Sequence, residues 1–130
     1  MDDMQTEVKA VPVSQLGEDE KLPKSIIFRN ITEEHDNGIT DFKCALYRSY
    51  VYGRYTDIKI TGEYSGKMSR YTLMMFLIYN GNGELIEASF DEEIDEDFRG
   101  IKTFSATVQV PNDEYISKVA VRFVPDPVFL

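Results

Sequence analysis

Between about residue 25 and residue 124, apolar and polar residues alternate in short stretches separated by turn sequences. In residues 102–110, Phe104, Ala106 and Val108 alternate with threonine, serine and glutamine, and residues 115–124 repeat the pattern. A period of two predicts a strand with one buried face. We expect seven strands, at residues 25–31, 40–51, 56–64, 71–79, 84–90, 102–110 and 115–124. Without a long amphipathic helix, they predict an all-β fold, an immunoglobulin-like antiparallel β-sandwich.

Turn sequences place the connections between these strands. Asn37-Gly38 and the Asn-Gly-Asn-Gly sequence at 80–83 favour tight turns, because asparagine and glycine tolerate a positive φ. We also expect a turn at 65–67. Residues 71–79 carry large apolar groups on both faces, which predicts a strand that is central or covered by another element.

The segment 42–52 also satisfies helical spacing. Its aromatic and β-branched residues favour a strand. A helix there would change the fold class to α+β.

The charge is concentrated in two segments of the 130-residue chain, which is long enough for one domain with its own core. The net charge is −9; residues 1–24 hold six acidic and three basic residues, and residues 91–100 hold six acidic and one basic. We therefore predict an acidic N-terminal tail or loosely docked arm at 1–24 and the β-sandwich domain at 25–130. Acidity argues against binding to nucleic acid or to an anionic membrane, because both require a basic surface.

Segments for membrane insertion or export are not evident. The longest apolar run, residues 73–79, is far shorter than the roughly 20 residues that span a bilayer. The first five residues have neither the basic nor the apolar region of a secretory signal. These features favour the cytoplasm for the chain as given, whereas an extracytoplasmic location would require a signal removed from it.

Catalytic residue types are scarce. The single cysteine, Cys44, excludes an intramolecular disulfide and a thiolate metal cluster. A dyad of Cys44 with His35, the only histidine, is conceivable across the turn at 37–38. Cys44, however, lies in an apolar context typical of a buried small side chain, and His35 lies in a polar turn. We predict no enzyme, no catalytic residue and no cofactor.

The acidic run at 91–97 invites comparison with a calcium loop. Asp91, Glu93 and Asp95 match the first three ligand positions of such a loop, but Glu96 stands where glycine is needed and Lys102 where a bidentate glutamate should be. A looser calcium site stays open. We favour a solvated loop or a short capped helix, in which Ser89 and Glu92 form a capping box and Ile94 contacts Phe98. No metal site is therefore predicted.

Four of the eight tyrosines lie within nine residues, together with two arginines. Tyrosine and arginine dominate the energetics of many protein interfaces, because each combines a large contact area with a polar end. An ordinary strand edge covered by tyrosines is the alternative. The predicted partner-binding residues are Tyr47, Arg48, Tyr50, Tyr52, Arg54 and Tyr55.

From residue 56 to about residue 124, the order of motifs resembles the FxLYD-type family of bacterial immunoglobulin-like β-sandwich domains. The motifs are Ile60-Thr61-Gly62, Phe76-Leu77-Ile78-Tyr79-Asn80, Gly83-Glu84-Leu85-Ile86 and Phe104-Ser105-Ala106-Thr107-Val108. The resemblance implies a noncatalytic accessory or interaction module, and members of the family are commonly exported.

Three hypotheses of function follow. The first is a noncatalytic domain that binds a protein partner through the tyrosine-rich segment or the acidic run. The second is an acidic inhibitor that mimics nucleic acid and blocks an enzyme groove, as phage proteins do. The third is a carbohydrate- or calcium-dependent binding module. Open strand edges would also permit a homodimer by edge pairing.

Overall fold

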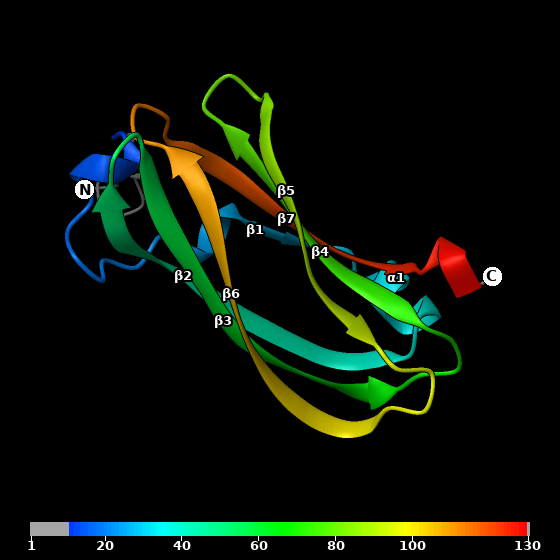
Figure 1. Cartoon of the computed structure of the whole chain (residues 1–130). Coiled ribbons are helices and arrows are strands. Elements are labelled where there is room, and N and C mark those ends of the chain that lie inside the picture. The colour runs from blue at the N-terminus through cyan, green and yellow to red at the C-terminus, as the bar shows by residue number, and fades with distance from the viewer. Residues whose placement is uncertain (1–10, 130) are drawn as a thin grey trace, which may run out of the picture.

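Two β-sheets pack face to face in the computed structural model, which describes residues 11–129 apart from the side chains of residues 90–92 and 129 (Figure 1). The three-stranded sheet has the order β2-β3-β6, and the four-stranded sheet has the order β1-β7-β4-β5. The strands are β1 (Ile27–Arg29), β2 (Ile39–Tyr52), β3 (Tyr55–Lys67), β4 (Thr72–Asn80), β5 (Leu85–Ile94), β6 (Arg99–Pro111) and β7 (Ile116–Pro125). The predicted all-β sandwich is confirmed.

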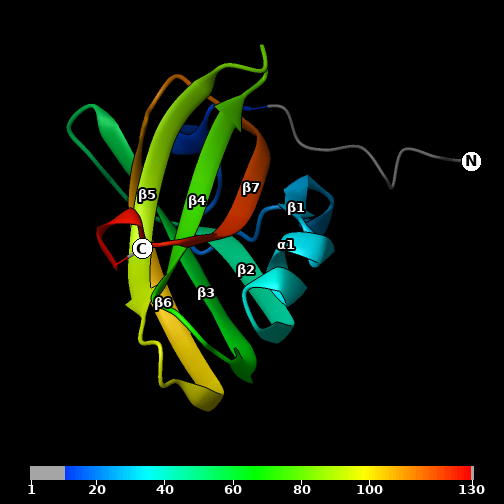
Figure 2. The ribbon, with the colours of Figure 1, turned by 90° about the vertical axis from the view of Figure 1, so that its right-hand side faces the viewer.

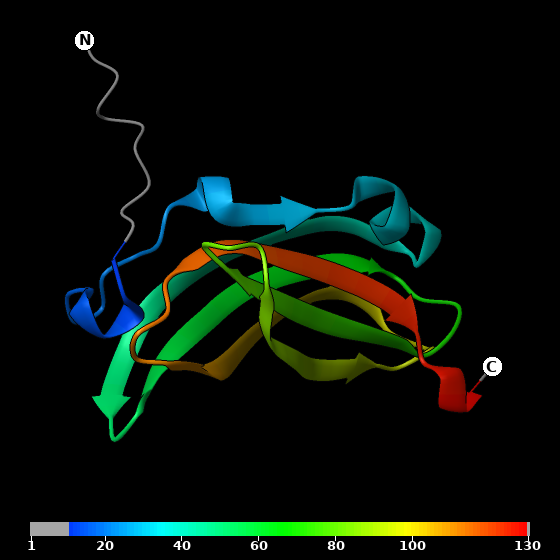
Figure 3. The ribbon, with the colours of Figure 1, turned by 90° about the horizontal axis from the view of Figure 1, so that it is seen from above.

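Short helical segments complete the described chain. They are the 3-10 turns η2 (Val13–Gln15), η3 (Lys24–Ile26) and η4 (Pro127–Phe129), and one α-helix, α1 (Ile31–Asp36). Among residues 11–129, no helix is long and apolar enough to cross a membrane. Figure 2 shows β5, β4, β7 and β1 side by side in front of the other sheet, and Figure 3 shows β1 and α1 along one side of the sandwich.

The first predicted strand is largely replaced by helical segments. Of the range 25–31, only β1 is extended, because η3 precedes it and α1 begins at its last residue. Asn30 ends the strand by capping the helix: its side-chain oxygen accepts a hydrogen bond from the Glu33 N–H at 3.0 Å. The polar segment expected to be a turn around His35 is therefore α1.

The sheets decide two further expectations, one about a strand and one about a turn. The segment 42–52 is strand throughout, as predicted. The turn expected at 65–67 is wrong, because β3 pairs with β6 as far as Lys67 opposite Arg99. Gly66 serves close backbone approach instead, since a Cβ atom there would collide with the carbonyl oxygen of Gly38.

The acidic run is extended where a short helix was one expectation. β5 continues to Ile94, whose side chain is buried, so the predicted helix with Ile94 and Phe98 on one face is wrong. The turn follows after Ile94, and the Asp95 carboxylate accepts a hydrogen bond from the Asp97 N–H at 2.8 Å within it. Only this exposed part of the run forms a loop.

An aromatic cluster joins the two sheets. The Phe42 ring stacks on Phe104 at 5.8 Å between centroids and meets Phe123 edge-on at 5.3 Å. The Phe104 ring fits because residue 62, opposite Cys44, is glycine: a Cβ atom there would lie 2.8 Å from the ring and collide with the Lys43 carbonyl. Each buried aromatic side chain contributes about 1.5–3 kcal/mol of burial free energy, so the cluster is a major part of the core.

Residues 11–24 of the predicted acidic arm pack on the sandwich. Val13, Leu16 and Leu22 are all buried and belong to the same core as the strands. The Val13 N–H also donates to the Glu114 carbonyl at 2.7 Å. The remaining part of the predicted arm, residues 1–10, lies outside the described residues.

Helix α1 is held against β7 by side chains that bond to the strand backbone. β1 covers only three residues of β7. Beyond it, the Glu33 carboxylate accepts from the Phe123 N–H at 3.1 Å, and the Asn37 amide donates to the Phe123 carbonyl at 2.8 Å. Glu33 also forms an ion pair with Arg122 at 2.6 Å. These bonds replace the missing neighbouring strand at Phe123.

The ion pair predicts a pH-dependent contribution to stability. The hydrogen bonds from Arg122 hold the pKa of Glu33 below its usual value. A lowered pKa stabilises the fold above the unfolded-state pKa, and the stabilisation is lost as the pH falls through the folded-state pKa. We expect Glu33→Gln to lower the free energy of unfolding by about 1–2 kcal/mol at pH 7, and by progressively less below about pH 4.5. Denaturant unfolding across this pH range measures it, with the exposed Glu18→Gln as control. An equal loss at pH 7 and pH 3 would contradict the assignment.

Candidate interaction surfaces

The β2–β3 hairpin presents four of the six predicted partner-binding residues at one end of the sandwich. Tyr50, Tyr52 and Tyr55 have exposed fractions of 68%, 50% and 45%, and Arg54 is also exposed. We call these four residues the tyrosine tip. Gly53 makes the tight connection possible, with a φ of +58°.

The tyrosine tip is ordered by hydrogen bonds at its base. The Asn112 side chain donates to the Gly53 carbonyl at 3.0 Å and accepts from the Thr56 hydroxyl at 2.8 Å. The Tyr52 hydroxyl donates to Asp57 at 3.2 Å and accepts from Gln109 at 2.7 Å. A register shift in β2 between Arg48 and Val51 accompanies the exposure of Tyr50, as bulges often do. An open groove of about 400 Å³ lies beside the tip, lined by residues 53–55 and 111–113.

Tyr47 and Arg48 lie apart from the tyrosine tip. Residues 19–22 run alongside β2 at these two positions. The Asp19 N–H donates to the Arg48 carbonyl, and the Arg48 N–H donates to the Glu20 carbonyl, each at 3.0 Å. Lys21 forms an antiparallel bridge with Tyr47. Both side chains are half-buried, and the Arg48 Nε is buried without a hydrogen-bond partner. The arm therefore divides the six predicted residues into two groups.

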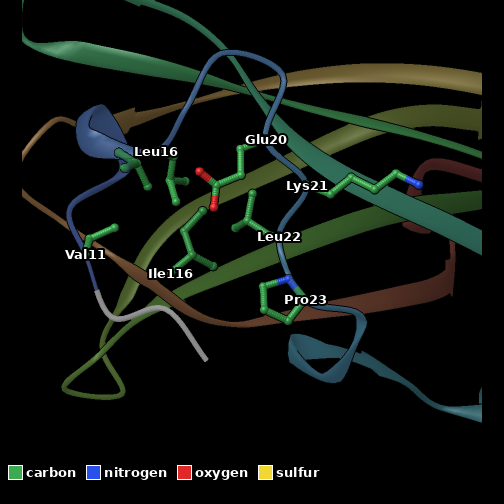
Figure 4. A pocket seen from close by; sticks show the side chains of 8 residues that line it. Val11, Leu16, Glu20, Lys21, Leu22, Pro23 and Ile116 are labelled. Carbon is green, nitrogen blue, oxygen red and sulfur yellow. The ribbon is translucent and has the colours of Figure 1, made fainter. Parts of the chain in front are cut away.

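The cavity under the arm is a packing gap (Figure 4). Its volume is about 20 Å³, and a single water needs about 10–15 Å³ measured in the same way. Val11, Leu16, Leu22 and Ile116 contribute apolar side chains to its wall. A small-molecule ligand has no room here.

Cys44 is half-buried within the edge strand β2, where it lines a shallow pocket together with Arg29. Burial raises the pKa of the Cys44 thiol to about 11, against a smaller opposing effect of the Arg29 charge. His35 is exposed on α1. A thiol that stays protonated at neutral pH is a poor nucleophile, which argues against the Cys44/His35 dyad.

The connection between β5 and β6 lies at the end of the sandwich opposite the β2–β3 hairpin (Figure 1), and it is rich in carboxylates. Glu93, Asp95 and Asp97 are exposed there, and the hydrogen-bonded neighbour Asp126 raises the pKa of Glu93. Asp95 also raises the pKa of Tyr71. Within the described residues, no group of three or more His, Cys, Asp or Glu side chains is arranged to hold a metal ion. The side chains of Asp91 and Glu92, which belong to the acidic run, lie outside the described residues, so the looser calcium site stays an expectation.

The outer face of the four-stranded sheet is largely apolar. The strand register places Phe28, Ala120, Leu77 and Ala88 in one row across the four strands, and Val124 beside Leu73 in another. Met74, Phe76 and Ile78 of β4 point into the core, so the alternate residues point outward. The same rows also hold Glu93, Lys118 and Arg122. We call the apolar members of the outward set the apolar face: Phe28, Leu73, Met75, Leu77, Tyr79, Leu85, Ala88, Ala120 and Val124.

The apolar face is open to solvent. Phe28 and Leu85 have exposed fractions of 51% and 53%, and the β4 residues between them are half-buried by their neighbours. Cationic side chains also lie on this face: the Lys118 ammonium is 5.2 Å from the Phe28 ring centroid and 5.0 Å from that of Tyr79, and Arg122 is paired with Met75 in the register. Large exposed apolar patches on domains commonly mark interaction sites.

The outer face of the three-stranded sheet has the opposite character. Its central rows place Lys43 beside Glu63, with an ion pair of 3.6 Å, and Thr61 beside Ser105. Apolar residues are therefore concentrated on the outer face of one sheet and are not spread over the whole protein surface. The signal for the apolar face was present in the sequence, because residues 71–79 are apolar on both faces. The sequence did not show that, within residues 11–129, no other element covers one of these faces.

The state of Cys44 predicts slow alkylation. At pH 8 a thiol with a pKa of about 11 is only about 0.1% thiolate, whereas an exposed cysteine is a substantial fraction ionised. We expect iodoacetamide to modify Cys44 at least about tenfold more slowly in the native chain than in the urea-unfolded chain, followed by mass spectrometry. Fast native labelling that His35→Ala slows would restore the dyad.

The pair Glu93 and Asp126 predicts the opposite pH effect to Glu33. A pKa raised in the folded state gives stability that is present below the unfolded-state pKa and is lost as the pH rises through the folded-state pKa. We therefore expect Glu93→Gln to raise the melting temperature at pH 7 and to change it little at pH 4. Thermal unfolding monitored by circular dichroism measures both values. A lower melting temperature at pH 7 would show that the Glu93 charge is stabilising.

None of the family models, curated proteins or solved structures compared with the chain matches it. The function is therefore inferred from the chemistry of the described surfaces.

Proposed function

We propose that the protein is a noncatalytic interaction domain that binds a protein partner through the apolar face. The observation that carries the proposal is the contrast between the two outer faces of the sandwich. Both are solvent-facing in this chain, but only one is lined by leucine, methionine, phenylalanine and valine. Each Å² of apolar surface removed from water contributes roughly 25 cal/mol, so a partner with an apolar surface gains affinity here.

The rigidity of the apolar face supports the same function. Its central residues belong to β4, which is paired on both sides along its length, by β7 and by β5. A partner therefore meets a surface whose backbone is already ordered, and less conformational entropy is lost on binding. The tyrosine tip is the alternative contact surface, since it is also exposed and ordered by hydrogen bonds.

The resemblance to FxLYD-type domains is consistent with a noncatalytic interaction domain. The strands divide four and three between the sheets, as in constant-type immunoglobulin domains. The parallel pairing of β1 with β7 departs from that arrangement. A noncatalytic accessory role is what the resemblance implies.

The inhibitor hypothesis has less support than partner binding. A nucleic-acid mimic needs carboxylates spread at phosphate-like spacing over one surface. The described carboxylates that gather do so around 93–97 and Asp126.

Paired threonine substitutions test the apolar face. We expect Met75→Thr with Leu77→Thr to weaken partner binding by at least about tenfold, because two apolar contacts are lost while strand propensity is kept. The full-length chain, immobilised, would capture the partner, which mass spectrometry identifies and titration calorimetry then measures. Met75→Leu with Leu77→Ile is the matched control, and melting temperatures verify folding.

Two outcomes would contradict the proposal. One is unchanged affinity in the threonine variant with loss of binding in Tyr50→Ser with Tyr55→Ser, which would assign the partner to the tyrosine tip. The other is the absence of any partner whose capture depends on either surface.

A further inference from the structure

The sandwich has strand edges on both sides of each sheet, and most of them are protected against pairing with another chain. Unpaired backbone groups at an edge bind other strands, so folded proteins shorten, cover, charge or bulge their edges. β1, the edge of the four-stranded sheet, is only three residues long. Where β1 ends, the Glu33 and Asn37 side chains occupy the N–H and carbonyl of Phe123.

The edge of β2 is covered by the chain itself. Residues 19–22 run antiparallel to it and exchange backbone hydrogen bonds with Arg48 and Leu46. β5, the edge of the four-stranded sheet opposite β1, is protected by its acidic residues and by its irregular pairing. Its sequence holds Glu87, Asp91, Glu92 and Glu93, and two register shifts interrupt its pairing with β4.

β6 has none of these protections along most of its length. It pairs with β3 over thirteen consecutive residues without a register shift, from Arg99 to Pro111. From Thr103 to Val110 it contains neither a charged residue nor a proline. Within residues 11–129, no backbone hydrogen bond from outside β3 reaches residues 103–110. Alternate N–H and carbonyl groups of β6 therefore face solvent.

We propose that this edge pairs with β6 of a second copy of the chain, in antiparallel orientation about a two-fold axis near Ser105. Such pairing joins the two three-stranded sheets into one sheet of six strands. Residues 103–107 of one copy then lie opposite residues 103–107 of the other, and none of them is charged. The uncharged centre makes the strand complementary to itself.

The ends of β6 are less complementary than its centre. With the axis near Ser105, Arg99 of one copy lies opposite Pro111 of the other, two residues before Asp113. Asp97, which precedes β6, would lie opposite Asp113, so attraction and repulsion both occur at the ends and the uncharged centre determines the pairing. Ile101, exposed by 70%, gains a neighbouring strand in the same arrangement. The net charge of −9 on each copy opposes approach at long range, so added salt strengthens the dimer.

Sedimentation equilibrium of the full chain tests the proposal. We expect a concentration-dependent rise from 15.0 kDa to twice that mass, with a dissociation constant that falls when sodium chloride is raised. Hydrogen exchange of the amides in residues 100–110 slows as the dimer forms, whereas that of β5 does not. This second readout needs no substitution.

Charge variants identify the strand that pairs. Ser105→Lys with Thr107→Lys places like charges opposite one another and weakens the dimer by about tenfold or more. The corresponding Glu variant does the same, and an equimolar mixture of the two forms a heterodimer. Gln15→Lys with Thr40→Lys, at exposed positions away from β6, adds the same charge and leaves the dimer intact.

Three results would overturn the proposal. The first is a monomer at every concentration up to the solubility limit, which would leave the edge for an extended segment of another protein. The second is a dimer that the β6 variants do not weaken, as expected if the apolar faces associate. The third is a failure of the Lys and Glu variants, each folded by circular dichroism, to form a heterodimer.

Discussion

At Phe123, β7 pairs with β4 on one side, whereas on the other side no strand among residues 11–129 lies beside it, and the side chains of Glu33 and Asn37 supply the hydrogen-bond partners there. An unsatisfied N–H or carbonyl buried at this position would cost about 1–3 kcal/mol each. The ring of Phe123 lies in the aromatic cluster with Phe42, so its backbone must be fixed for the core to close. Helix α1 is therefore part of the sandwich, because it completes a sheet edge with side chains instead of a strand.

The same requirement explains the course of the N-terminal part of the described chain. Residues 19–22 lie along β2, and the chain then crosses to β7 on the other sheet, where β1 and α1 cover its edge. One segment thus protects one edge of each sheet and closes the same side of the sandwich (Figure 3). Its acidic residues suggested an arm, but Val13 and Leu22 bury their side chains in the core. Charge density alone did not reveal these few anchoring residues.

Strands β2 to β7 were predictable from the sequence, most of them because one face is buried and alternation is a local property, and β4 because its apolar residues are continuous. Helix α1 was not predicted, because its six residues have no apolar stripe and its stability comes from Glu33 and Asn37 bonding to a strand far along the chain. The turn predicted at 65–67 was wrong because Gly66 is required by the close approach of two backbones and not by a turn. The tyrosine-rich segment was found as a cluster, but its division into an exposed tip and the half-buried Tyr47 and Arg48 depends on where the arm lies.

The two surfaces left open differ in the interaction that each can make. The apolar face offers side chains without free backbone groups, because β4 is paired on both sides. The β6 edge offers backbone hydrogen bonds with mostly uncharged side chains, so shape and register decide what binds there. Pairing at β6 extends the three-stranded sheet and leaves the outer face of the four-stranded sheet uncovered in each copy. A dimer joined through β6 would therefore present two apolar faces, and a partner with two matching sites would bind with higher avidity than either face alone provides.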